Sequence, residues 1–100
     1  MEIRPLDETL IGALGIEITE LSEDRAVATM PVKPITHQPF GYLHGGASVV
    51  LAESIASMAT YNLIDKETEL AFGLEINANH TKAKQDGIVT AIATPLHKGF

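Results

Sequence analysis

A run at positions 45–64, GGASVVLAESIASMATYNLI, constrains the fold more than any other segment of this chain. It contains no Lys, Arg or Asp, and Glu53 near its middle is its single acidic residue. Such a run predicts a long helix over 46–63 that is apolar all round and therefore buried. A membrane span of the same length would place Glu53 and several hydroxyl and amide side chains in lipid, which is costly. We therefore expect a helix inside a protein and no membrane span.

Alternating apolar and polar residues predict strands on both sides of this helix. A short amphipathic helix is expected over 7–14, and residues 16–21 and 25–32 then form a hairpin. After the long helix, residues 70–82 and 87–98 predict two further strands joined by a turn. An antiparallel sheet curling around the buried helix is its simplest cover, which predicts an α+β fold.

The composition limits the partners and the compartment. One hundred residues with 45% hydrophobic content predict a single domain over 1–100. The net charge of -6 argues against nucleic acid or an anionic membrane as the main partner. There is no cysteine for a disulfide or a thiolate zinc site, and the start MEIRPLDETL does not resemble a targeting signal. These features predict a cytoplasmic protein.

Glu53, Ser57 and Thr60 fall at i, i+4 and i+7 of the predicted helix, so they share one stripe of an otherwise apolar cylinder. Burying an unpaired carboxylate is costly, and a chain that keeps one usually has a partner or a use for it. The same pattern also fits a Glu53 that pairs with a Lys or Arg elsewhere, or that lies on a partly exposed helix.

The start of the helix carries His44-Gly45-Gly46, where backbone N–H groups have no partner within the helix and the helix dipole is positive. Two glycines there allow a substrate to approach closely, and such a terminus can bind the oxyanion of an attacked carbonyl. An ordinary helix start with glycine as its cap explains the pattern as well.

Gly45 and Glu53 are eight residues apart, which is roughly 12 Å along a straight helix. One chain therefore cannot direct both groups at the same carbonyl. If both act in catalysis, they come from two subunits whose helices run antiparallel past a twofold axis. An enzyme of this kind is expected to be a homodimer with two sites.

The run HQPFGYLHGGASVVLAESIAS closely resembles the signature of hotdog-fold thioesterases of the 1,4-dihydroxy-2-naphthoyl-CoA and 4-hydroxybenzoyl-CoA (Arthrobacter-type) family. The segments ATMPV and GLEINANH extend the resemblance over nearly the whole chain. The resemblance implies a hotdog fold, with a sheet wrapped around one long central helix, in a homodimer or a dimer-of-dimers tetramer. It also implies hydrolysis of an aromatic or medium acyl-CoA without any cofactor beyond the coenzyme A of the substrate. The resemblance further suggests 1,4-dihydroxy-2-naphthoyl-CoA as the substrate and hence a role in menaquinone biosynthesis.

The resemblance also implies roles for residues of the signature. Glu53 would be the nucleophile or general base, and the Gly45 N–H would polarise the thioester carbonyl. Gln38 and His44 would orient that carbonyl and hold the loop, while Ser57 would position the hydrolytic water or the carboxylate. A carboxylate and one or two donors suffice for an electrophilic thioester, so no metal is expected.

Further candidate substrate contacts are Gly46, His80, Lys82 and Lys84. His80 would line the acyl or pantetheine channel, although a strand histidine is more often simply hydrogen-bonded. The two lysines and Lys98 could meet the phosphates of CoA or could be solvated strand ends. Four histidines invite a metal site, yet none of them has the short helical spacing of zinc ligands.

The chain departs from the family at its end, because family members carry two more strands after the segment that corresponds to PLHKGF.

Two other functions stay open. The chain could be a non-catalytic hotdog domain that binds acyl-CoA or assembles with a partner. It could also be a hotdog dehydratase or hydratase, although those enzymes use an Asp/His pair where this chain has Glu53.

Overall fold

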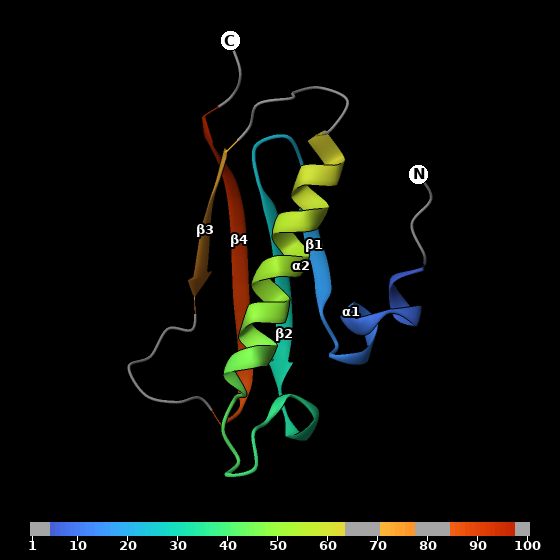
Figure 1. Cartoon of the computed structure of the whole chain (residues 1–100), viewed down its shortest axis with the longest axis vertical. Helices are drawn as coiled ribbons and strands as arrows, with labels where there is room; N and C mark the ends of the chain where they lie inside the picture. Colours follow the sequence, from blue (N-terminus) through green and yellow to red (C-terminus); the bar gives the residue numbers. More distant parts are fainter. Residues whose placement is uncertain (1–4, 64–70, 78–84, 98–100) are drawn as a thin grey trace.

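The computed structural model describes residues 5–63, 71–77 and 85–97. Its four strands form one antiparallel sheet in the order β1-β2-β4-β3, and the helix α2 lies across one face of this sheet (Figure 1). The elements in chain order are the 3-10 helix η1 Leu6–Glu8, α1 Leu10–Ala13, β1 Glu17–Leu21, β2 Ala26–Val32, the 3-10 helix η2 Pro34–Thr36, α2 Gly45–Leu63, β3 Ala71–Asn77 and β4 Gly87–His97. The predicted α+β class is confirmed.

One side of α2 and one face of the sheet make the core. The buried side chains of α2 recur every four residues, so they form a single stripe along the helix. They are Ala47, Leu51, Ile55 and Ala59. The facing positions of β2 and β4 alternate as a half-covered sheet requires, with Ala26, Ala28, Met30, Val32, Val89, Ala91 and Ala93 buried. Six alanines among these residues allow the helix and the sheet to approach closely.

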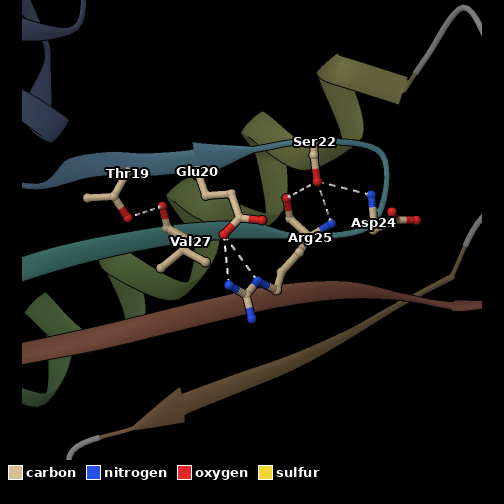
Figure 2. Close-up of polar contacts among 6 residues, drawn as sticks. All are labelled: Thr19, Glu20, Ser22, Asp24, Arg25 and Val27. Atoms are coloured by element: carbon tan, nitrogen blue, oxygen red, sulfur yellow. Dashed lines mark hydrogen bonds and ion pairs between the residues drawn. The ribbon is translucent and has the colours of Figure 1, made fainter.

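The turn between β1 and β2 is held by its serine (Figure 2). The Ser22 Oγ accepts hydrogen bonds from the N–H groups of Asp24 (3.2 Å) and Arg25 (3.1 Å), which is a common way for serine to stabilise a turn. Beside the turn, the Arg25 guanidinium donates to the Glu20 carboxylate at 2.8 Å. This hydrogen bond and the nearby negative charge raise the pKa of Arg25. The pair is exposed, so it adds little to stability.

The predicted elements are confirmed with small changes at their ends. The two strand pairs β1–β2 and β3–β4 are antiparallel, and α2 begins at Gly45, one residue before the predicted start. The helix expected over 7–14 is divided into η1 and α1, and the chain turns at Gly15 with a φ of 74°. Residues 78–84, which include the end of the strand expected over 70–82 and the start of the turn expected at 83–87, lie outside the described residues.

The prediction that α2 is buried all round is wrong for this chain. Its far side is open, and Glu53, Ser57 and Thr60 on that side are exposed. The reason is geometric, because a sheet that packs on one side of a helix leaves the other side uncovered.

Among the described residues, no helix combines the length and the hydrophobicity of a membrane-spanning segment.

Candidate functional site

The open side of α2 carries a second regular stripe. Val49, Glu53, Ser57 and Tyr61 follow one another at intervals of four residues and are all exposed. They are offset by two positions, about 200° around the helix, from the buried stripe. The sequence prediction that Glu53, Ser57 and Thr60 share one side of the helix is therefore confirmed. The side they share points away from the sheet.

A depression of about 420 Å³ lies on this side of the helix. Its lining residues are Glu53, Ala56, Ser57, Thr60 and Tyr61, so within the described residues α2 alone forms it. The Thr60 hydroxyl donates to the Ala56 carbonyl at 2.9 Å, which satisfies that hydroxyl within the helix. No described residue forms an ion pair with the Glu53 carboxylate. An acid thus stands at one end of an open depression and an aromatic ring at the other.

The helix start is capped by the residue before it. The Nδ1 of His44 accepts a hydrogen bond of 2.7 Å from the Gly46 N–H, and the His44 carbonyl accepts from Ala47 N–H at 3.0 Å. Because Nδ1 is the acceptor, the neutral imidazole carries its proton on Nε2. A Cβ atom on Gly46 would lie 2.9 Å from the His44 ring, so a glycine makes room for the ring.

Gly45 differs from its neighbour in its surroundings. A Cβ atom there would meet no described atom within 4 Å, and the Gly45 N–H has no hydrogen-bond acceptor among the described residues. The φ of Gly45 is not positive, so other residues could adopt this backbone. Neither the packing nor the backbone of the described chain therefore requires a glycine at this position.

Gln38 fixes the loop that leads to the helix. Its N–H donates to the Tyr42 carbonyl at 2.7 Å, its carbonyl accepts from Gly41 at 3.0 Å, and its side-chain oxygen accepts from the Phe40 N–H. The His44 N–H donates to the Thr36 carbonyl at 2.8 Å. Gln38 and His44 thus make hydrogen bonds that hold the loop, and a role in orienting a substrate carbonyl stays a prediction.

The predicted site residues fall into two groups within one chain. Glu53 and Ser57 lie one turn apart on the open side of α2, whereas His44, Gly45 and Gly46 form its start, two turns earlier. His80, Lys82 and Lys84 lie outside the described residues.

The sequence interpretation missed Ala56 and Tyr61, which also line the depression. Their positions, three and eight residues after Glu53, place them on the same side of α2.

The histidines that the structure describes do not gather into a metal site. Within residues 5–63, 71–77 and 85–97, no three His, Asp or Glu side chains lie close enough to hold a metal ion. The His37 side chain contacts the backbone, with its Nε2 2.9 Å from the Gln85 carbonyl oxygen. This contact links the loop before α2 to the start of β4.

Comparison with known proteins relates this arrangement to a family. The sequence model of the Thioesterase superfamily matches residues 40–99. A 1,4-dihydroxy-2-naphthoyl-CoA hydrolase of Listeria monocytogenes is 52% identical over 86% of this chain and 69% of its own length. The Escherichia coli protein of the same name is 50% identical over 90% of this chain and 65% of its own length.

Among solved structures, thioesterase HI1161 from Haemophilus influenzae superposes with a TM-score of 0.73 at 45% identity, over 94% of this chain and 65% of that one. The chain spans between 59% and 75% of the length of several similar curated relatives. The matched range includes α2 with Glu53 and Ser57 and the start of the helix. The chain therefore belongs to the Thioesterase superfamily and has its hotdog fold.

Proposed function

We propose that this protein hydrolyses the thioester of an acyl-CoA to a free acid and CoA, with Glu53 as the nucleophile or general base. The observation that carries the proposal is the placement of Glu53. It is an acid without an ion pair to any described residue, at the edge of an open depression, with the Ser57 hydroxyl one turn away. The names of the relatives, thioesterase and CoA hydrolase, support the same reaction.

The proposed hydrolysis uses water as its only co-reactant. As a general base, Glu53 takes a proton from water while the water oxygen adds to the thioester carbon. The carbonyl oxygen becomes an oxyanion, and its collapse breaks the C–S bond and releases the CoA thiolate, which takes up the proton. As a nucleophile, the carboxylate would instead attack the thioester carbon and form an acyl anhydride as the C–S bond breaks and the CoA thiolate leaves. Water would then hydrolyse the anhydride to the free acid and regenerate the Glu53 carboxylate. In either route Ser57 positions the water or the carboxylate.

Gly45 is proposed as the oxyanion donor. It is a glycine that the described packing and backbone do not require, and its N–H has no described acceptor. A small residue with a free donor at a helix start suits close approach by a carbonyl oxygen. The neighbouring loop, held by Gln38 and His44, would keep this donor in place.

The separation of Gly45 from Glu53 makes the proposed enzyme a homodimer. The two groups are roughly 12 Å apart along one helix, so each site takes Glu53 from one protomer and Gly45 from the other. Two such dimers could associate further into a tetramer.

The acyl group is proposed to be aromatic or of medium length. Two relatives are named 1,4-dihydroxy-2-naphthoyl-CoA hydrolase, and the depression beside Glu53 ends at the aromatic ring of Tyr61. We propose 1,4-dihydroxy-2-naphthoyl-CoA as the substrate, which places the protein in menaquinone biosynthesis in the cytoplasm. His80, Lys82 and Lys84 are proposed to contact the substrate.

A thiol-release assay with benzoyl-CoA and 1,4-dihydroxy-2-naphthoyl-CoA tests the proposal. Glu53→Gln should reduce kcat on the order of 10²-fold or more, because the amide can neither accept the proton nor attack. Glu17→Gln, which removes an exposed acid on β1, is the matched control and should keep the rate. An unchanged rate in Glu53→Gln would contradict the mechanism, and binding of acyl-CoA without any thiol release would favour a non-catalytic domain.

A further inference from the structure

The loop at 37–44, which leads from η2 to the start of α2, is closed by contacts among its own residues. His37 and Leu43 form an isolated β-bridge at its base. Inside this bridge, the Gln38 N–H donates to the Tyr42 carbonyl at 2.7 Å. Contacts of this kind join residues that are close in sequence, so they fix the shape of the loop but not its orientation against the sheet.

Two contacts hold the base of the loop beside the core. Thr36, directly before the loop, is buried, and its hydroxyl lies 2.9 Å from the carbonyl oxygen of Pro31 on β2. Leu43 packs its apolar side chain against the buried core cluster. An apolar contact keeps a segment close without fixing its direction, because the hydrophobic effect is non-directional. These two contacts therefore place the base of the loop but do not orient it relative to β4.

The side chain of His37 provides a directional contact with the neighbouring strand. Its Nε2 lies 2.9 Å from the carbonyl oxygen of Gln85, 48 positions later and two residues before β4 begins at Gly87. A carbonyl oxygen only accepts, so the Nε2 of His37 carries a proton and donates. The loop and the start of β4 lie at the same end of the sheet (Figure 1), where Val32 of β2 pairs with Gly87. This hydrogen bond therefore ties the loop to the strand beside the one that it leaves.

We propose that His37 is a positioning residue for thioester hydrolysis, because its hydrogen bond to the Gln85 carbonyl orients the loop and with it the N–H of Gly45. Leu43, opposite His37 in the β-bridge, is two residues before Gly45, so the path from the hydrogen bond to the proposed oxyanion donor is short. The inference rests on the proposed function, since an oxyanion donor acts only when it is aligned. A misplacement of about 1 Å can cost on the order of 10²-fold in rate.

The expected loss is in kcat rather than in KM, because an oxyanion donor binds the transition state more strongly than the substrate. His37→Phe keeps a planar ring without the donor, so kcat for benzoyl-CoA should fall roughly 10- to 100-fold, with KM changed by less than about twofold. His37→Gln places an amide N–H near the position of the imidazole Nε2 and should keep most of the rate. The shorter amide of His37→Asn should not reach Gln85, so this variant should behave like His37→Phe.

Ser22→Ala is the matched control for the loss of a side-chain hydrogen bond that holds a turn. The Ser22 Oγ accepts two N–H groups in the turn between β1 and β2, at the end of the sheet opposite to the loop (Figure 1). This variant should keep kcat, and thermal melting followed by circular dichroism checks that each variant is folded. Equal losses of kcat in Ser22→Ala and His37→Phe would indicate a general structural effect and overturn the proposal.

Amide hydrogen–deuterium exchange gives a second measurement that needs no substrate. His37→Phe should accelerate exchange in peptides that cover 37–46 and leave peptides from β2 unchanged, because only the loop loses a contact. His37→Gln should exchange like the parent. Parent-like exchange over 37–46 in His37→Phe would overturn the proposal.

A double variant tests whether His37 acts through Gly45. If it does, His37→Phe combined with Gly45→Ala should be little slower than Gly45→Ala alone, since the donor is already impaired. Losses that multiply would show that the two residues act independently and would reject the path through Gly45.

The outcomes separate this inference from the proposed reaction. Loss of thiol release in Glu53→Gln with a full rate in His37→Phe would retain the reaction and reject the role of His37. A parent chain that releases no thiol would reject the proposed function and with it the effect of His37 on catalysis. The exchange measurement would still decide whether His37 holds the loop.

Discussion

The Nδ1 atom of His44 accepts a hydrogen bond of 2.7 Å from the backbone N–H of Gly46. This contact makes His44 the N-cap of α2 and leaves the imidazole proton on Nε2. It also divides the roles of the two glycines. Gly46 makes room for the His44 ring, whereas the space around Gly45 is open toward whatever approaches the start of the helix.

The cap predicts different effects for two substitutions of His44. His44→Ala removes the acceptor for the Gly46 N–H and should lower the free energy of unfolding by about 0.5–2 kcal/mol. His44→Asn provides an amide oxygen at a similar position and should keep most of that stability. Thermal denaturation followed by circular dichroism measures the difference, and equal losses in the two variants would show that the side-chain cap does not stabilise the helix.

The two glycines should respond differently to alanine. Gly45→Ala meets no described atom and favours the helix, so its melting temperature should equal or exceed that of the parent. Its methyl group would nevertheless stand where the thioester carbonyl is proposed to approach, so kcat/KM for benzoyl-CoA should fall at least about tenfold.

Gly46→Ala serves as the comparison for this prediction. Its Cβ would lie 2.9 Å from the His44 ring and force the ring off its cap, so the cap loss of about 0.5–2 kcal/mol should offset the gain in helix propensity. A Gly45→Ala enzyme with full activity would remove Gly45 from the proposed oxyanion site.

Tyr61 should affect the choice of acyl group. Its ring lines the depression that contains Glu53, so Tyr61→Ala should raise KM for an aromatic acyl-CoA by roughly 10-fold or more and leave kcat for acetyl-CoA nearly constant. Tyr61→Phe keeps the ring and should restore most of the affinity. The same fold change in KM for benzoyl-CoA and acetyl-CoA would indicate a general structural effect.

The contact between α2 and the sheet should dominate the stability of the chain. Leu51 is fully buried between the helix and the sheet, so Leu51→Ala should cost about 2–5 kcal/mol through the cavity that it leaves. Leu10→Ala makes the same chemical change at a side chain that is 56% exposed and should cost much less. Urea denaturation of the two variants provides the measurement, and similar midpoints would argue against this core.

The sequence by itself determined the elements and the spacing of the candidate residues. The run at 45–64 predicted a helix to within one residue at its start, and alternation of apolar residues predicted β1, β2, β3 and β4. The common side of Glu53 and Ser57 also followed from the sequence alone. These features depend on local periodicity, which the backbone geometry of helices and strands translates directly into positions.

Only the tertiary structure decided which side of α2 is covered. Apolar residues occur on every side of α2, so the sequence predicted a helix buried all round and left an exposed Glu53 as an alternative. The structure shows Glu53 exposed. The choice depends on shape, since Ala47 and Ala59 allow close contact with the alanines of β2 and β4, and shape complementarity between distant segments has no local signal in sequence. The His44 cap and the depression that ends at Tyr61 arise in the same way, from contacts and surfaces that exist only once the chain has folded.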